Sequence, residues 1–220
     1  MFMKLYSARL SPFATRARIA VYAKGLDVEI LLPPGGPRSA EYLAINPIGK
    51  IPCLVTDKGG TIPESDTIVE YLDERFPEPS LLPGDAEARA RVRLLSRVGE
   101  VYVMAPISRL WPQLDPAARD AAAVEALFGE IDQGLGRLEA LLAGGDYAFG
   151  GRLTQADCQL APTLAYVPAM GAMFGQGDRL QAWPKVAAYA RAVVRDPHVA
   201  RALGEMNQAM AHYGKTGQFT

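Results

Sequence analysis

The sequence reads Asn46-Pro-Ile-Gly-Lys-Ile-Pro52, and Glu64-Ser65 follows twelve residues later. A peptide bond before proline needs only about 0.5–1 kcal/mol to turn cis, so a cis Ile51-Pro52 bond would present the amide and carbonyl of Ile51 like a short β-strand. A free peptide can pair with such a strand by strand addition. Ser65 stands where a helix should begin, and the amides of a helix start favour a carboxylate. The pattern predicts a cradle for a zwitterionic peptide, with its backbone, amine and carboxylate held by Ile51, Glu64 and Ser65; a strand-entry proline beside an ordinary helix cap is the alternative.

A second pattern lies near the N-terminus, where a short strand is followed by Ser11-Pro-Phe-Ala-Thr-Arg16. Ser11 is a good helix cap, and Pro12 loses no hydrogen bond at the first helical position. A hydroxyl at the positive end of a helix can also donate to a bound thiolate. Such caps are common, so the pattern alone allows a structural or a functional role.

Four motifs in this order make the chain resemble the glutathione transferase family over essentially its whole length. They are Ser-Pro-Phe-x-x-Arg at 11–16, Asn-Pro-x-Gly-Lys-x-Pro at 46–52, Glu-Ser at 64–65 and Leu-Thr-x-Ala-Asp at 153–157. Ser11 matches the serine-using, tau-like and zeta-like branches. The resemblance implies a thioredoxin-like domain that binds glutathione as co-substrate, an all-helical second domain, and a cytoplasmic homodimer.

The composition argues against several other functions. The 220 residues are 49% hydrophobic and 21% charged, with a formal net charge of −1, so the basic stripe of a nucleic-acid-binding protein is missing. No apolar run approaches the ~20 residues of a membrane span, and no signal-like leader opens the chain. His198 and His212 are too few for a metal site. We expect Cys53 and Cys158 to be buried free thiols in a reducing compartment.

The first 80 residues alternate between strand and helix patterns. We expect strands at 4–6, 28–32, 51–56 and 61–62, and helices at 12–24, 39–45 and 65–76. This order predicts a mixed four-stranded sheet covered by helices, which places the chain in the α+β class.

Three prolines and a glycine between residues 77 and 84 interrupt these patterns and indicate a domain boundary. We therefore predict a first domain at 1–78, a linker at 79–85 and a helical bundle at 86–220. Within the bundle, apolar stripes predict helices at 86–112, 116–143, 155–172, 184–195 and 197–211. Thr154-Gln-Ala-Asp157 has the form of a capping box and is interpreted as a folding element.

The resemblance also assigns roles to individual residues. Only the thiolate of glutathione is nucleophilic, and Ser11 would stabilise it, with Tyr6 and Ser7 as open alternatives. The residues that would contact glutathione are Phe13, Lys50, Ile51, Pro52, Glu64 and Ser65. Lys50 would bind the glycine carboxylate, and Glu64 and Ser65 the glutamyl end. Arg16 and Arg18 resemble arginines near the family's site, and for Arg18 we expect a structural pairing.

The second substrate is expected between the domains, against the helix predicted at 86–112. The candidate lining residues are Leu10, Tyr102, Met104, Ile107, Ser108, Trp111 and Tyr166, joined by Met170. Such a lining suits an aromatic or otherwise apolar electrophile. Aromatic residues and methionines at helical spacing are also typical of a helical core, and this alternative stays open.

These residues favour a glutathione S-transferase that activates the glutathione thiolate for attack on a hydrophobic electrophile. The first alternative is glutathione-dependent cis–trans isomerisation of a small dicarboxylate, as in the zeta-like branch. The usual Ser-Ser-Cys run of that branch is replaced here by Ser11-Pro12-Phe13, which counts against it. Ether cleavage or dehalogenation by the same thiolate, and a non-catalytic ligand-binding protein on this scaffold, are further alternatives.

Overall fold

The computed structural model of the protein describes residues 2–82 and 84–216. By their internal contacts, the residues form two compact units. The first contains Met1–Leu81 and Pro197–Thr220, and the second contains Leu82–Asp196. Pro83, part of the linker expected at 79–85, lies outside the described residues.

The first unit is built on a mixed sheet of four strands within the described residues, ordered β2-β1-β3-β4. The strands are β1 (Met3–Tyr6), β2 (Val28–Leu31), β3 (Cys53–Val55) and β4 (Thr61–Pro63). Strand β1 runs parallel to β2 and antiparallel to β3, and β3 runs antiparallel to β4. Leu5 and Leu54 face each other across β1 and β3 and are fully buried. The mixed sheet predicted from the sequence is confirmed.

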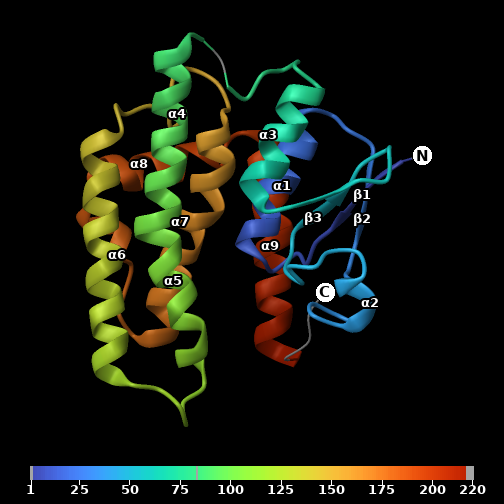
Figure 1. Ribbon diagram of the computed structural model, residues 1–220. Coiled ribbons are helices and arrows are strands. Elements are labelled where there is room, and N and C mark those ends of the chain that lie inside the picture. The colour runs from blue at the N-terminus through green and yellow to red at the C-terminus, as the bar shows by residue number, and fades with distance from the viewer. Residues whose placement is uncertain (1, 83, 217–220) are drawn as a thin grey trace. The chain divides into compact units, whose positions relative to one another are not determined.

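The helices of the first unit include one from the far end of the chain. They are α1 (Pro12–Ala23), α2 (Ala40–Leu43), α3 (Ser65–Arg75) and α9 (Pro197–Thr216). Helix α1 packs against both α3 and α9, and the three helices lie on one side of the sheet (Figure 1). The sequence placed 197–211 in the helical bundle, whereas its buried stripe, which includes Val199, Leu203 and Met206, packs in the first unit. An apolar stripe shows that a helix packs, but not on which partner.

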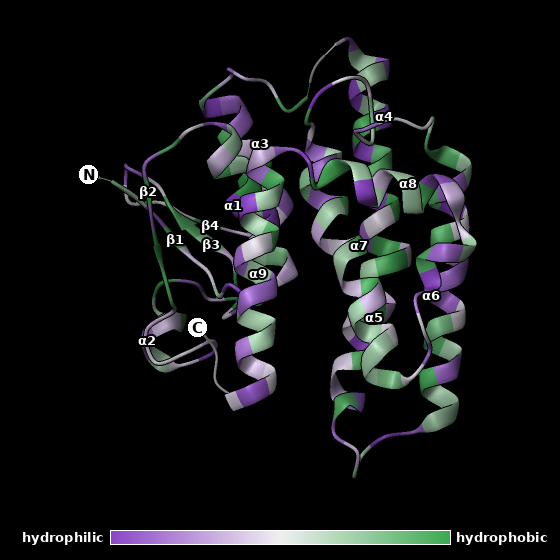
Figure 2. Cartoon of the chain, turned by 180° about the vertical axis from the view of Figure 1, so that it is seen from behind, coloured by the Kyte–Doolittle hydropathy of each residue, from purple (hydrophilic) through white to green (hydrophobic). Residues whose placement is uncertain are grey.

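The second unit is all-helical, as expected. Its α-helices are α4 (Ala86–Val98), α5 (Ala105–Leu110), α6 (Ala121–Leu141), α7 (Gln155–Phe174) and α8 (Pro184–Val193), and its 3-10 turns are Trp111–Leu114 and Arg179–Ala182. Helix α7 packs against α4, α5 and α8, and is buried over most of its length. Figure 2 shows hydrophobic residues along α6 and α7. Within the described part of the chain, no helix combines the length and hydrophobicity that crossing a bilayer requires.

The helix expected at 86–112 contains a π-helical segment, Gly99–Met104, between α4 and α5. Pro106 explains its position, because proline has no N–H to donate to the carbonyl four residues earlier, that of Tyr102. This carbonyl lies against Gly134 of α6: a Cβ added at Gly134 would be 2.0 Å from the Tyr102 oxygen. The widened turn therefore rests directly on the backbone of α6.

The start of α6 also differs from the expected position. The helix begins at Ala121, where residue 116 was expected. The Oδ1 atom of Asp120 accepts the N–H groups of Ala122 (2.9 Å) and Ala123 (3.1 Å) and so caps the helix there.

Cys53 and Cys158 are buried free thiols, as the sequence predicted. Cys53 lies in β3, and burial raises the pKa of its thiol to about 11. Because only the thiolate is nucleophilic, Cys53 is expected to be inert in the folded protein at pH 8 and to react once the protein unfolds. Titration with a chromogenic disulfide reagent, in native buffer and in denaturant, with each cysteine replaced by alanine in turn, measures this. Rapid native labelling of Cys53 would contradict the prediction.

Candidate functional site

Ser11 is the N-cap residue of α1, and Pro12 follows it at the first helical position. The N–H of Ala14 donates to the Ser11 Oγ over 3.2 Å, and the Ser11 side chain is half-buried. A serine hydroxyl accepts and donates at the same time, so Ser11 can cap the helix and also donate its proton to a ligand. The positive end of the α1 dipole lies at the same place and favours an anion there.

The two alternative hydroxyls have different surroundings. Tyr6 lies in β1, and its ring packs edge-on against the ring of Tyr42 with centroids 5.5 Å apart. Ser7 is 3% exposed, and its Oγ accepts a hydrogen bond from the Nη1 of Arg18 over 3.4 Å. Of these three hydroxyls, only that of Ser11 lies at a helix start. This position favours Ser11 as the hydrogen-bond donor to a bound thiolate.

The 46–52 stretch is held in shape by the buried side chain of Asn46. Its Nδ2 donates to the Lys50 carbonyl (2.7 Å), and its Oδ1 accepts the N–H of Ile48 (3.1 Å). The Tyr42 hydroxyl donates to the same Lys50 carbonyl over 2.8 Å. Burial raises the pKa of Tyr42 to about 12, so its hydroxyl stays protonated as a donor. The sequence analysis did not predict that the Asn46 side chain would hydrogen-bond within this turn, although Asn46 is the first residue of the 46–52 motif.

The Ile51-Pro52 peptide bond is cis, as the sequence suggested. Strand β3 begins at Cys53, although a strand had been expected from residue 51. Ile51 therefore precedes the strand, and its side chain is half-buried, while the side chain of Lys50 is exposed.

Glu64 and Ser65 form the start of α3. Glu64 has φ 70° and ψ 122°, a left-handed conformation that costs a residue other than glycine roughly 1–3 kcal/mol. Its side chain is exposed and does not cap the helix. Ser65 is 5% exposed, and its Oγ accepts from the Nη1 of Arg16 over 3.4 Å. The Arg16 guanidinium also lies 4.5 Å from the ring centroid of Phe13, so one arginine connects the starts of α1 and α3.

The sheet register brings these segments to one edge. Tyr6 is paired with Cys53, and Cys53 is paired with Pro63. Because these strands are antiparallel, the exit of β1 toward Ser11, the entry to β3 and the exit of β4 toward Glu64 lie together. All the residues predicted to contact glutathione thus come from segments at the same edge of the sheet in the first unit. Among the described residues, no cluster of histidine, cysteine, aspartate and glutamate could hold a metal ion.

Comparison with known proteins agrees with this arrangement. Residues 5–80 match the model of the glutathione S-transferase N-terminal domain, and residues 121–192 match that of the C-terminal domain. The chain is similar to a maleylacetoacetate isomerase of Pseudomonas aeruginosa, with 35% identity over 84% of this chain and 87% of that protein. The chain belongs to the glutathione S-transferase family.

Solved structures of this family are also similar to the chain. A zeta-class bacterial maleylpyruvate isomerase in its holo form has a TM-score of 0.75 and 32% identity, covering 90% of this chain and 95% of that one. A glutathione S-transferase of Methylobacterium radiotolerans, solved in complex with glutathione sulfonate, has a TM-score of 0.77 and 26% identity. That match covers 92% of this chain and 94% of the other.

The residues predicted to contact a hydrophobic electrophile in this glutathione S-transferase family member fall into two groups. Met104, Ile107, Tyr166 and Met170 are buried in the second unit, which favours the core alternative for these four. The others are more accessible: Tyr102, Trp111, Ser108 and, in the first unit, Leu10.

Two of the more accessible residues also have contacts within the second unit. The Arg137 guanidinium lies 4.4 Å from the ring centroid of Tyr102, and the Ser108 hydroxyl donates to the Met104 carbonyl over 3.0 Å. A substrate-binding role for Leu10, Tyr102, Ser108 and Trp111 stays a prediction.

Proposed function

We propose that this family member binds glutathione in its first unit and ionises the glutathione thiol beside Ser11, so that the thiolate attacks a hydrophobic electrophile. The observation that carries the proposal is the Ser11 hydroxyl at the N-terminus of α1, on the sheet edge shared with Ile51-Pro52 and Glu64-Ser65. The relative solved with glutathione sulfonate supports the same ligand. A cytoplasmic homodimer, as the family resemblance implies, belongs to the same proposal.

Each part of the proposed site matches a group of glutathione. The Ile51 backbone pairs with the peptide, the exposed Lys50 ammonium binds the glycine carboxylate, and the Glu64 carboxylate binds the glutamyl amine. The start of α3 at Ser65 suits the glutamyl carboxylate, because its amides point at a bound anion. At Ser11, a hydroxyl donor and a helix dipole both favour the charged sulfur, and each pKa unit of depression is worth about 1.4 kcal/mol.

A second candidate function is glutathione-dependent cis–trans isomerisation, favoured by the similarity to the Pseudomonas aeruginosa maleylacetoacetate isomerase. A thiolate can add to an activated cis alkene, allow rotation about the resulting single bond, and leave again. Conjugation of an aryl halide consumes glutathione, whereas isomerisation regenerates it. An assay that follows glutathione together with either an aryl halide or a cis-dicarboxylate such as maleylpyruvate therefore separates the two functions. Turnover of neither substrate, with no binding to immobilised glutathione, would favour a non-catalytic protein.

Replacing Ser11 with alanine is expected to raise the apparent pKa of bound glutathione and to lower kcat by about 10²-fold, as for the loss of one positioned donor. The measurement is the pH dependence of the thiolate absorbance and of turnover. Ser11→Thr keeps a hydroxyl and a helix cap, and should retain most of the rate. An unchanged pH profile in Ser11→Ala would move the thiolate-stabilising role to Tyr6 or Ser7.

A further inference from the structure

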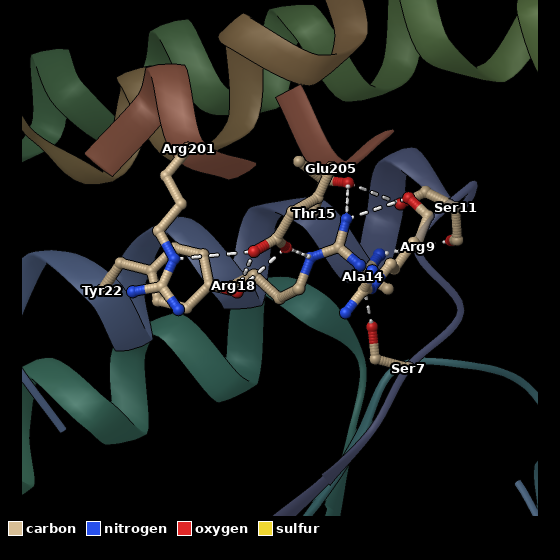
Figure 3. A network of polar contacts seen from close by, with 9 residues as sticks. All are labelled: Ser7, Arg9, Ser11, Ala14, Thr15, Arg18, Tyr22, Arg201 and Glu205. Atoms are coloured by element: carbon tan, nitrogen blue, oxygen red, sulfur yellow. Dashed lines mark hydrogen bonds and ion pairs between the residues drawn. The ribbon is translucent and has the colours of Figure 1, made fainter. Parts of the chain in front are cut away.

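A fully buried guanidinium, that of Arg18, belongs to the second turn of α1, six residues after Pro12. Its Nη2 donates to the Arg9 carbonyl over 2.9 Å and to the Thr15 Oγ1 over 2.7 Å, and its Nη1 donates to the Ser7 Oγ over 3.4 Å. Its Nε lies 3.6 Å from the Glu205 carboxylate of α9 (Figure 3). A buried charge is tolerated only when it is paired and hydrogen-bonded, so this arginine orders the segments it touches.

The partners of Arg18 surround Ser11. Ser7 and Arg9 belong to the segment that leads from β1 to Ser11, and Thr15 lies in the first turn of α1. The Thr15 hydroxyl accepts from Arg18 and donates to the Ser11 carbonyl over 2.9 Å. Because Arg18 occupies the acceptor side of this hydroxyl, its proton is directed to Ser11. The Ser11 N–H donates in turn to the Ala8 carbonyl over 3.0 Å.

Glu205 supplies the counter-charge for Arg18 from the last helix of the chain. Its carboxylate accepts the Tyr22 hydroxyl, which lies 2.9 Å from both carboxylate oxygens. Burial, and then the hydrogen bond to Glu205, raise the pKa of Tyr22, so its hydroxyl remains a donor. On the solvent side, the Arg201 Nε lies 3.5 Å from Glu205, and the Arg201 guanidinium stacks 3.8 Å from the ring centroid of Tyr22. The Glu205 side chain is thereby held from two sides while it faces Arg18 (Figure 3).

We propose that Glu205, acting through Arg18 and Thr15, is a positioning residue for the Ser11 hydroxyl. The inference rests on the proposed function, in which that hydroxyl stabilises the glutathione thiolate. Helix α9 thereby contributes to the reaction through Arg18 and Thr15. The contacts run from Glu205 to Arg18, from Arg18 to Thr15, and from Thr15 to the Ser11 backbone.

Positioning and simple electrostatics predict opposite results when the Glu205 carboxylate is removed altogether, as in Glu205→Ala. If Glu205 acted on the thiolate only through its charge, its loss would leave the Arg18 and Arg201 cations uncompensated and would lower the pKa of the bound thiol. If Glu205 positions Ser11, its loss releases Arg18, displaces the donor and raises that pKa. A merely structural ion pair would lower stability and leave the pKa of the bound thiol unchanged in the folded protein.

The test measures the apparent pKa of the thiol in full-length protein saturated with glutathione, from the ultraviolet absorbance of the thiolate against pH. It also measures kcat with an aryl halide and the KM for glutathione. Glu205→Ala and Thr15→Val are expected to raise the pKa of the bound thiol by about one unit and to lower kcat about tenfold. The KM for glutathione should stay within about twofold, because the groups that hold the rest of the tripeptide are unchanged.

Two variants serve as matched controls. Glu205→Gln keeps an acceptor oxygen for Tyr22 and Arg18, so this variant should retain most of the wild-type kcat. Glu29→Ala removes an exposed carboxylate of the same unit, paired with Lys4 outside this network, and should leave the pKa of the bound thiol and kcat unchanged. If Glu205→Ala gives no folded protein, Thr15→Val provides the test of positioning. It is expected to fold, because valine keeps the buried volume of threonine.

Two results would overturn the inference. The first is a lower or unchanged pKa of the bound thiol in Thr15→Val and in folded Glu205→Ala. If the pKa of the thiol bound to the wild-type protein is below that of free glutathione, this result overturns the inference and leaves the proposed function intact. A wild-type thiol that titrates like free glutathione would overturn the proposed function, and this inference with it.

Discussion

Replacement of Asp157 with alanine is expected to lower the free energy of unfolding by about 4 kcal/mol and to remove most of the soluble protein. The Asp157 side chain is fully buried at the start of α7. Its Oδ2 accepts the N–H (2.7 Å) and the hydroxyl (2.8 Å) of Thr154, and its Oδ1 accepts the N–H of Ala148 (2.7 Å) and the hydroxyl of Tyr189 (3.0 Å). Alanine would leave all four donors without this acceptor in the interior.

The charge and the oxygens of Asp157 are both needed. Burial raises the pKa of the carboxyl, while the four hydrogen bonds oppose the shift by favouring the ionised form. An asparagine would turn its amide nitrogen toward a backbone N–H on one side, that of Ala148 or that of Thr154, so Asp157→Asn should also be strongly destabilised. Natural domains have only about 5–15 kcal/mol of stability, so either change should reduce the folded fraction in the cell.

Denaturant unfolding and soluble yield measure this effect, with Asp120→Ala as the matched control. Asp120 also accepts two backbone N–H groups at a helix start, but it is exposed to solvent, so its loss should cost only about 1 kcal/mol. Equal unfolding midpoints for the two variants would contradict the prediction. Intact yield of Asp157→Ala with its activity gone would place Asp157 in the functional site instead.

Replacement of Gly134 with alanine is the second change with a large expected effect. The added Cβ would meet the Tyr102 carbonyl oxygen at 2.0 Å and the side chain of Val103 at 3.0 Å. The oxygen belongs to the backbone of the π-helical segment, so a rotamer change cannot relieve the clash. We expect a loss of about 3 kcal/mol, at the upper end of overpacking effects, as α6 and the π-helical segment move apart.

The same helix provides the control for this substitution. Gly129 also lies within α6, but a Cβ added there meets no atom within 4 Å. Gly129→Ala should therefore raise the free energy of unfolding by about 0.5–1 kcal/mol, through helix propensity alone. Thermal or denaturant unfolding should show a lower free energy of unfolding than the wild type for Gly134→Ala and a higher one for Gly129→Ala. A Gly134→Ala protein as stable as the wild type would show that the π-helical segment does not depend on this close approach.

Much of the fold and of the candidate site could be predicted because the signals are local. The Ser11 cap, the 46–52 turn and the Thr154–Asp157 box each involve interactions within a few residues. Strand alternation and helical stripes likewise depend on periods of two and of about 3.6 residues. These features gave the mixed sheet, the helical second unit and the segments that meet at one sheet edge.

The features that could not be predicted depend on residues far apart in the chain. The partner of α9, the counter-ion of Arg18 and the burial of Met104 and Ile107 were not visible in the sequence. A stripe of apolar residues fits many partners, and a buried charge finds its counter-ion only when two distant helices meet. The π-helical segment is an intermediate case, because Pro106 marks its place but Gly134 supplies the surface on which it rests.

The sequence by itself therefore determined the local elements of this glutathione S-transferase family member and the residue types at the sheet edge proposed to bind glutathione, because short-range hydrogen bonds and side-chain periodicity encode them. Only the tertiary structure showed that Glu205 is the counter-ion of Arg18, and that Met104, Ile107, Tyr166 and Met170 are buried. Packing between distant segments determines burial and charge pairing, and that information is not contained in any one stretch of the chain.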